Sequence, residues 1–307
     1  MVTTPLVSIC IPAFRAEKYL QETLDSVSTQ TFADWEIIVT EDGSKDRAEE
    51  ITRAFAQTVS QTVTYSRHEV NQGLPATRNT GIALARGQFV ALLDSDDYWA
   101  PTHLEDLVNT QKARDLDFVH SGSILFDNDT KAILELRRPT ELQVSRFPLS
   151  LYAEGYVIQP SSVMVRKSVF EKLGGYDVSF RYCEDIELWF RAAKNGVTFG
   201  FTGHDTCHYR KHGGALTAHG GPMAFAAARA YVKHFDWATL PTAIRKQRTS
   251  SQLASAGRIY LRSEPGRAWG FFSQAWRVQK NLKYLGLSLA ANALAKKQGQ
   301  KLQPFVV

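Results

Sequence analysis

The chain has 307 residues, of which 44% are hydrophobic and 22% charged, a composition typical of a globular protein with one large α/β domain or two domains. Its three cysteines are too few and too scattered for a disulfide framework or a zinc site, which favours a reducing compartment. No stretch approaches the roughly 20 apolar residues of a membrane-spanning helix. The apolar stretch 6–14 is short and interrupted by Pro12, so no signal peptide is expected.

The net charge of +5 conceals two segments of opposite sign. Residues 229–307 contain 14 Lys and Arg but only two acids, Asp236 and Glu264, which gives this segment a formal charge of +12. The remaining 22 basic and 29 acidic residues give a charge of −7. Opposite charges on two segments suggest two separate roles.

The first 100 residues alternate strand and helix patterns. Strands are expected at 6–12, 35–40, 62–67 and 88–93, and helices at 17–30, 46–59 and 75–86. The third helix has Pro75 near its start and Gly87 just past its end. Four such alternations predict a mainly parallel sheet with helices on both faces, and ligands that lie beyond the carboxyl ends of the strands.

The second hundred residues continue with mixed elements, and the last part is helical. We expect a helix over 101–114, a hairpin of 117–127 and 132–138, a strand and a short helix within 161–175, a helix over 184–196 and a strand over 197–203. From Pro222 onward every pattern is helical, with the clearest break at 262–270. There is no internal repeat and no low-complexity linker.

Three carboxylates crowd the exit of the fourth strand, in the stretch FVALLDSDDYW (89–99). Their mutual repulsion needs a positive partner. Asp94 and Asp96 are two residues apart, so in extended geometry they point the same way and suit a hard cation such as Mg²⁺ or Mn²⁺. The alternative is helix capping, which is sufficient to explain Asp97.

Polar residues also follow the other strands. Glu41 and Asp42 begin EDGS, which is either a ligand contact or an ordinary Asp-Gly turn. Arg78 on the third helix either meets a phosphate at the same edge or lies on a solvated face. No Walker A or GxGxxG pattern is present, which argues against P-loop enzymes and dinucleotide binders.

Two further candidates lie downstream. Glu184 and Asp185 begin a helix, where acids also simply complement the helix dipole. Arg210 and His212 lie on a glycine-bounded loop, where they are either phosphate or metal contacts or solvated side chains.

Together these segments resemble the inverting family 2 glycosyltransferases of the GT-A fold, of the kind that builds bacterial surface polysaccharides. The resemblance covers residues 5–217, and the order of its motifs is as specific as their content. The matching stretches are 7–30, 35–46, 71–99, 160–177, 183–196 and 209–217.

The resemblance implies a nucleotide-sugar donor, most often a UDP-sugar, and identifies Asp94-Ser95-Asp96 as the family's DxD motif. A Mn²⁺ or Mg²⁺ ion would then be the positive partner, with Asp96 as the direct ligand and Asp94 nearer the ribose or the ligand waters. Arg210 and His212 fall where a loop closes over the diphosphate, and His212 is a further candidate metal ligand.

The resemblance also assigns the nucleotide pocket and the base. Pro12, Ala13 and Phe14 would border the nucleobase, with Phe14 stacked on it. Asp42 would hydrogen-bond to uracil or ribose, and Arg78 would lie beside the nucleotide. Asp185 falls at the position of the catalytic base, with Glu184 as the competing candidate.

Two positions depart from the family pattern. Glu41 replaces the first of two common aspartates, so Asp42 is the more trusted contact of the pair. Phe14 replaces a common tyrosine, which keeps the stacking face and loses the hydroxyl.

The implied organisation is a GT-A catalytic domain over 1–220 and a basic helical extension over 221–307. The first domain would divide into a nucleotide-binding half (1–100) and an acceptor-binding half (101–220). The acceptor would be a hydroxyl of a glycan or a lipid-linked molecule. We expect a cytoplasmic protein that does not bind nucleic acid.

Alternatives remain for the extension and for the activity. The extension either binds the anionic inner face of the cytoplasmic membrane, or packs on the catalytic domain or on another copy in a homo-oligomer. The rival functions are a sugar nucleotidyltransferase and a non-catalytic nucleotide-sugar-binding or scaffold protein. A glycine-free segment after the first strand disfavours the former, and the acids at 94, 96 and 185 weigh against the latter.

Overall fold

A computed structural model describes residues 4–213 and 220–306 of the chain. The chain divides into two compact units, one of residues 1–151 and 155–213 and the other of residues 152–154 and 214–307. The division after Gly213 falls seven residues before the predicted boundary at 220. The last part of the sixth matching stretch, residues 214–217, lies outside the described residues.

The first unit is built on one sheet, with the strand order β3-β2-β1-β4-β8-β6-β9-β5. Strands β1 (Val7–Ala13), β2 (Trp35–Glu41), β3 (Val63–Arg67) and β4 (Phe89–Leu92) are mutually parallel. Every residue of β1, β2 and β4 is buried, because helices cover both faces of this part of the sheet. The expected strands are therefore present and in the expected order along the chain.

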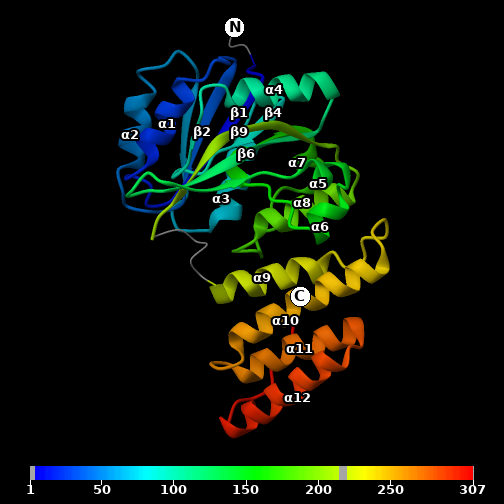
Figure 1. Cartoon of the computed structure of the whole chain (residues 1–307). Helices are drawn as coiled ribbons and strands as arrows, with labels where there is room; N and C mark the ends of the chain where they lie inside the picture. Colours follow the sequence, from blue (N-terminus) through cyan, green and yellow to red (C-terminus); the bar gives the residue numbers. More distant parts are fainter. Residues whose placement is uncertain (1–3, 214–219, 307) are drawn as a thin grey trace. The chain divides into compact units, whose positions relative to one another are not determined.

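The helices of this half are α1 (Leu20–Ser28), α2 (Ala48–Phe55) and α3 (Leu74–Leu84). Helix α1 packs against α2, and α3 packs against β1 and β2 (Figure 1). The apolar side of α1, with Leu20, Leu24 and Val27, joins the core formed by Ile9 and Ile37. This packing fixes the carboxyl ends of β1, β2 and β4 at one edge of the sheet.

The second half of the sheet is largely antiparallel. Strand β8 (Val163–Arg166) lies antiparallel between β4 and β6 (Phe118–Asp127), and β7 (Ile133–Arg137) completes the predicted hairpin with β6. Strand β9 (Phe199–Lys211) runs parallel to β6, and β5 (Tyr98–Trp99) pairs antiparallel with its far part.

The helices of this half are α4 (His103–Arg114), α5 (Glu141–Ser145), α6 (Leu149–Ala153), α7 (Lys167–Leu173) and α8 (Glu184–Lys194), with the 3₁₀ turn η1 at Pro160–Ser162.

One expectation about this half is wrong. The sequence placed Arg210 on a loop after a strand that ends near 203, whereas β9 continues to Lys211. The extension exists because β6 continues to offer backbone partners, with Phe126 opposite Arg210. Arg210 is therefore a strand residue with a fixed direction, and only His212 follows the strand.

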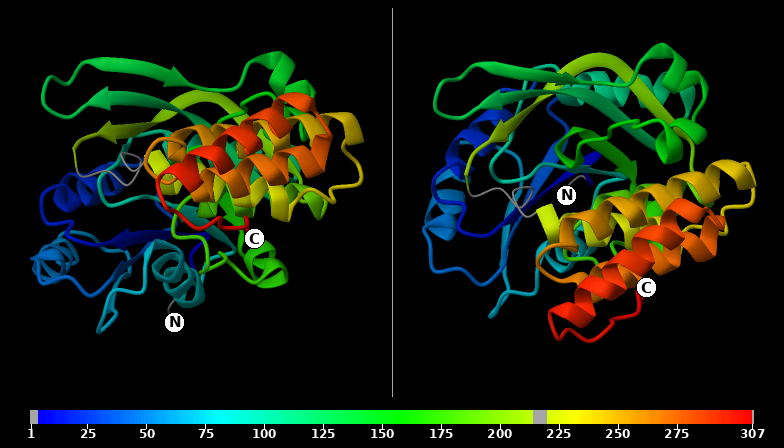
Figure 2. Two further views of the ribbon diagram at one scale, coloured as in Figure 1. Left: turned by 90° about the horizontal axis from the view of Figure 1, so that it is seen from below. Right: turned by 60° about the horizontal axis from the view of Figure 1, so that its bottom comes forward.

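The second unit consists of the helices α9 (Gly220–Lys233), α10 (Thr242–Tyr260), α11 (Pro265–Gln279) and α12 (Leu282–Lys297). Each helix packs against the next one in the chain, as both views in Figure 2 show. Their core contains Leu253, Phe271 and Phe272. Within residues 4–213 and 220–306, no helix combines the length and hydropathy needed to cross a bilayer.

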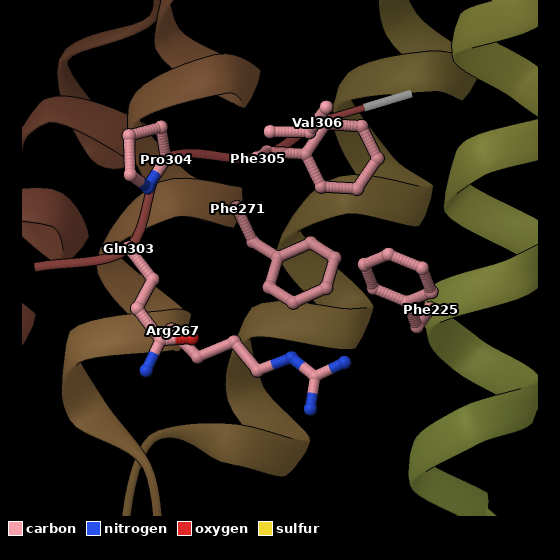
Figure 3. Close-up of a pocket in the computed structure, with 7 residues that line it drawn as sticks. All are labelled: Phe225, Arg267, Phe271, Gln303, Pro304, Phe305 and Val306. Carbon is pink, nitrogen blue, oxygen red and sulfur yellow. The ribbon is translucent and has the colours of Figure 1, made fainter.

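The last residues of the chain lie along α11. A Cβ on Gly270 would come 2.1 Å from the Gln303 carbonyl oxygen, so only glycine allows this close approach. Phe305 then packs near Phe225 and Phe271 and, with Arg267, lines a small cavity of about 180 Å³ (Figure 3). Arg267 lies over the Phe225 ring, and most of the other lining residues are apolar or aromatic.

All three cysteines are free thiols in buried positions. Cys10 lies in β1, Cys207 in β9 and Cys183 just before α8, with exposures of 1%, 0% and 5%. Burial raises the thiol pKa of each of them. They act as small core residues.

Candidate active site

The acidic loop that follows β4, Asp94–Asp97, is anchored at its first and last residues. The Asp94 backbone N–H donates to Ser161 Oγ, which lies 2.5 Å from Asp97 Oδ2. Asp97 is completely buried, and the Arg210 backbone N–H also donates to it. Burial, followed by the charges of Asp96 and Asp94, raises the pKa of Asp97 well above its usual value. Asp97 is thus an internal anchor of the loop, and the open carboxylates are those of Asp94 and Asp96.

Asp96 meets His212 at the open side of this loop. Asp96 Oδ2 and His212 Nε2 are 2.8 Å apart, and their side chains are 34% and 18% exposed. A carboxylate oxygen suits both Mn²⁺ and Mg²⁺, and an imidazole nitrogen suits the transition metal Mn²⁺ better than the hard ion Mg²⁺. Among the described residues, no group of three or more His, Cys, Asp and Glu converges on a metal position. The pair therefore fits an ion that takes its other ligands from water and substrate phosphate.

Arg78 connects the acidic loop to the start of α8. One of its terminal nitrogens donates to Asp94 at 2.7 Å and the other donates to Glu184. The guanidinium is 1% exposed and lies 5.4 Å from the centre of the Tyr176 ring. Burial opposes its charge, but Asp94, Tyr176 and Glu184 together raise the pKa of Arg78 well above its usual value. Arg78 is a buried cation that neutralises two acids from opposite halves of the unit.

The two acids that begin α8 have different surroundings. Glu184 is 6% exposed, and burial raises its pKa to about 7 against the opposing effect of Arg78. Asp185 is partly exposed, and its Oδ1 accepts from the Ile186 N–H at 2.8 Å. Burial also raises the pKa of Asp185, against that hydrogen bond. Helix α8 thus begins with a carboxylate committed to Arg78 and, next to it, a carboxylate that forms no ion pair with the residues that the structure describes.

The end of β1 presents an aromatic ring beside a closed turn. Ala13 is buried at the strand end and its carbonyl accepts from the Asp42 N–H at 2.8 Å. The next residue, Phe14, is 45% exposed, with the Arg15 guanidinium 5.2 Å from its ring centre. Pro12 pairs with Thr40 in the β1–β2 register, so Pro12, Ala13 and Phe14 lie at the same edge as Glu41 and Asp42.

Asp42 is enclosed by its own loop. Its two oxygens accept from the backbone N–H groups of Gln72 and Gly73, each at 2.8 Å, and His68 Nδ1 lies 2.8 Å from Oδ1. Burial opposes ionisation, yet the hydrogen bonds from Gln72, His68 and Gly73 hold the pKa of Asp42 below its usual value. This network ties β2 to the loop before α3, and it occupies both oxygens of the carboxylate.

Glu41 is as buried as Asp42. Its Oε1 accepts from the Ser44 N–H at 2.5 Å, and its Oε2 lies 3.2 Å from Arg67 Nε. That second approach lacks hydrogen-bond geometry, so Oε2 is an unsatisfied buried acceptor. The longer side chain of glutamate closes the turn here, and its second oxygen is paired with Arg67 by charge without a hydrogen bond.

Arg210 is almost completely buried. Its Nε donates to the Asp96 carbonyl at 2.6 Å, Nη1 to Asn128 Oδ1 at 2.9 Å and Nη2 to Glu22 Oε2 at 2.6 Å. It is 1% exposed and thus differs from the solvent-facing phosphate contact that the sequence suggested. The diphosphate role of Arg210 stays a prediction.

The structure thus brings the expected residues into two clusters. Arg78, Asp94 and Glu184 form one, with Asp185 beside it, and Asp96, His212 and Arg210 form the other. Ser95 connects them in the chain, and its carbonyl lies 3.0 Å from the Thr23 hydroxyl. Sequence reasoning missed partners such as Thr23, His68, Ser161 and Tyr176, because each belongs to an otherwise ordinary helix, loop or turn.

A model of the family described as "Glycosyl transferase family 2" matches residues 8–174, more than half of the chain. The chain belongs to glycosyl transferase family 2. The uncharacterised glycosyltransferase MJ1057 of Methanocaldococcus jannaschii is 30% identical over 209 residues, which cover 67% of this chain and 71% of that protein. The uncharacterised glycosyltransferase RT0329 of Rickettsia typhi is 31% identical over 195 residues, 61% of this chain and 58% of the relative. This chain therefore covers less than two thirds of the length of some relatives, RT0329 among them.

Solved structures show the same fold over almost the whole chain. S. aureus TarS 1-349 in complex with UDP-GlcNAc has a TM-score of 0.71 at 17% identity, covering 97% of this chain and 93% of that one. The mannosyltransferase PcManGT from Pyrobaculum calidifontis, in complex with GDP-Man and Mn²⁺, has a TM-score of 0.63 at 16% identity, covering 98% and 89%. The family 2 chain has the predicted GT-A fold with a C-terminal helical region.

Proposed function

We propose that this family 2 protein is an inverting glycosyltransferase that moves a sugar from a UDP-sugar to a hydroxyl of a glycan or lipid-linked acceptor. One observation carries the proposal: the buried Arg78 holds Asp94 and Glu184 at once. The Arg78 guanidinium therefore joins the acidic loop that is expected to hold the donor to the helix that begins with the expected base. A purely structural ion pair would not need a partly exposed Asp185 beside it.

Asp185 is the proposed general base. It would accept the proton of the acceptor hydroxyl while the hydroxyl oxygen attacks the anomeric carbon from the face opposite the departing nucleotide, which gives inversion. Burial raises the pKa of Asp185 and so strengthens it as a base. Glu184 is committed to Arg78, which makes it the supporting acid of the pair.

Asp96 and His212 would hold a divalent ion, with Asp94 nearer the ribose or the ligand waters. The ion would neutralise charge that builds on the leaving diphosphate. Mn²⁺ in the PcManGT complex supports this proposal by analogy alone. The protein's own part is to keep Asp96 open toward that ion while Asp97 and Ser161 anchor the loop.

The nucleobase would lie at the edge formed by Pro12, Ala13 and Phe14, stacked on the exposed Phe14 ring. Asp42 is proposed to shape this edge by holding the loop before α3 through the N–H groups of Gln72 and Gly73. Glu41 Oε2, one residue before Asp42 in the chain, is an acceptor without a hydrogen bond. The UDP-GlcNAc complex of TarS supports a uridine nucleotide as the first donor to try.

The C-terminal helices are the proposed membrane-facing part. Residues 265–307 contain no acid and seven Lys and Arg. On α12, Leu282 and Leu289 are 79% and 61% exposed, and Lys283 lies in the first turn, where the helix dipole disfavours a cation. Exposed leucines and an excess of Lys and Arg both favour contact with an anionic bilayer.

Flotation tests that surface. The wild type should float with anionic vesicles at low salt and not with neutral ones, and Leu289→Asp should reduce binding. If the wild type never floats and instead elutes as an oligomer, the helices pack on another copy.

The function is tested by donor turnover. The wild type with Mn²⁺ should release UDP from at least one member of a UDP-sugar panel in the presence of a hydroxyl acceptor. Asp185→Asn should lose about 100-fold or more of the transfer rate while UDP binding stays within about twofold, because only the base is removed. Glu184→Gln should lose less.

Three outcomes contradict the proposal. Release of pyrophosphate from UTP and a sugar 1-phosphate, tested in a parallel assay, indicates a nucleotidyltransferase, and binding without turnover of any donor indicates a non-catalytic protein. Normal turnover of Asp185→Asn with an inactive Glu184→Gln transfers the base assignment to Glu184.

A further inference from the structure

We propose that Arg210 is a positioning residue that does not contact the diphosphate. It braces the acidic loop through its backbone and so fixes the position of the Asp96 carboxylate as a metal ligand. This inference rests on the proposed function in one respect, the assignment of Asp96 as a metal ligand. It concerns how the chain itself holds that ligand still.

The brace is visible in the hydrogen bonds of the guanidinium. Each of its three nitrogens donates to a different part of the unit: Nε to the Asp96 carbonyl, Nη1 to Asn128 after β6, and Nη2 to Glu22 on α1. The backbone N–H of the same residue donates to Asp97 at 2.9 Å. One residue thus holds both the main chain of Asp96 and the side chain of Asp97.

Arg210 is also enclosed by aromatic rings. The guanidinium carbon lies 4.7 Å from the centre of the Tyr19 ring, 5.0 Å from Phe126 and 5.6 Å from Tyr98. With 1% exposure, the side chain would have to abandon these rings and three acceptors to reach a phosphate. Removing a buried cation from its partners is unfavourable, so the observed arrangement is the favoured one.

Strand β9 and the residue that follows its end both contact Asp96. Arg210 holds the Asp96 backbone, and two residues further on His212 Nε2 approaches the Asp96 carboxylate at 2.8 Å. From the opposite side, the Thr23 hydroxyl lies 3.0 and 2.8 Å from the carbonyls of Ser95 and Asp97. The backbone carbonyls of 95, 96 and 97 are therefore all within hydrogen-bond reach of buried side chains, and the Asp96 carboxylate stays partly exposed.

The experiment separates a brace from a phosphate contact. Arg210→Met and Arg210→Lys are compared with the wild type for binding of uridine and UDP in EDTA, and for binding of Mn²⁺ in the presence of UDP, followed by the electron paramagnetic resonance of free Mn²⁺. The brace predicts that uridine and UDP affinities in EDTA stay within about twofold. It predicts that Mn²⁺ affinity falls about 10- to 100-fold, as when partners of metal ligands are removed. Lysine should not restore it, because one ammonium cannot serve three divergent acceptors.

Two further variants keep the test decisive if Arg210 variants fold poorly. Thr23→Val removes the hydroxyl and keeps the side-chain shape, and it should weaken Mn²⁺ binding in the same direction by a smaller factor. Arg166→Met is the matched control, since Arg166 also binds two acids but pairs with Phe89 at the opposite end of β4. It should lower thermal stability without changing Mn²⁺ affinity.

The inference is overturned if Arg210→Met weakens UDP but not uridine in EDTA, since that result marks a direct phosphate contact. It is also overturned if Arg210→Met and Thr23→Val bind Mn²⁺ as the wild type does. If the wild type turns over no donor while these binding differences are observed, the proposed function fails and the brace stands.

Discussion

Two acidic segments lie at the ends of the strands on either side of β1: the first corner follows β2 and contains Asp42, and the second corner follows β4 and contains Asp96. The protein satisfies their carboxylates in opposite ways. At the end of β2, Asp42 accepts backbone N–H groups and a histidine and has both oxygens occupied. At the exit of β4, side chains hold the loop by its carbonyls and by Asp97, and the Asp96 carboxylate is 34% exposed. At the first corner the Asp42 carboxylate holds a loop in place. At the second corner buried side chains hold the loop, and the Asp96 carboxylate stays partly exposed.

The difference shows that an acid at a strand end is not by itself a ligand site. The relevant quantity is how many of its oxygens the protein has already satisfied. By this measure Asp96 and Asp94 each have one oxygen engaged, by His212 and Arg78 respectively, whereas Asp42 has both oxygens engaged within its loop.

The largest effect is expected at Asp96. Asp96→Asn should lower kcat/KM by about 100- to 1000-fold. The metal loses an anionic ligand, and the charge that builds on the diphosphate is then less well neutralised. Turnover should be measured over a Mn²⁺ titration, with the exposed hairpin variant Asp129→Asn as control. Full activity in EDTA, or an unaffected Asp96→Asn enzyme, would show that this corner holds no metal.

Asp42→Asn should act on stability. One oxygen becomes an amide N–H₂ facing backbone donors, so at least one partly buried N–H loses its charged acceptor, at a cost of about 2 kcal/mol in the free energy of unfolding. Chemical denaturation measures this cost, and the exposed Asp34→Asn gives the baseline. The comparison of corners fails if Asp42→Asn keeps full stability and only abolishes uridine binding.

Phe14 follows β1, between the two corners, and should affect donor binding alone. Phe14→Ala should raise the donor KM by about tenfold with little change in kcat, as expected for the loss of one aromatic–base stack. Phe14→Tyr keeps the ring and should behave as the wild type. Equal KM values for all three proteins would remove the nucleobase from this edge.

The smallest effect is a pH dependence at the first corner. The pKa of Asp42 is lowered in the folded state, so its contribution to stability is present above the usual value of 3.8 and is lost as pH falls through the folded pKa. The stability gap between the wild type and Asp42→Asn should therefore narrow below about pH 4. If the difference in stability between the two proteins instead grows in acid, folding raises the pKa of Asp42 rather than lowering it.

Much of the fold was predictable because its patterns are local. The largely apolar strands and the Pro75 and Gly87 boundaries identified the parallel half, and the motif order identified the GT-A fold. The C-terminal helices followed from periodicity alone. The length of β9 was not predictable, because its polar far part is held by pairing with β6, which is a long-range interaction.

The candidate residues were found by type, but their partners were not. Arg78 and Asp94 are 16 residues apart, whereas Arg78 and Glu184 are 106 apart, and no local pattern reports the second contact. Arg210 was read as a loop cation because its sequence neighbours are polar. Its burial depends on Tyr19, Tyr98 and Phe126, which come from three distant elements.

The buried cysteines have a practical consequence for spectroscopy. Since Cys10, Cys183 and Cys207 are at most 5% exposed and burial raises their thiol pKa values, they should react slowly with maleimide dyes in the folded protein. A single cysteine introduced at an exposed position such as Val70 or Leu282 can then be labelled selectively without removing the native thiols. Fluorophores placed in this way on each unit would report the distance between them while donor and vesicles are added.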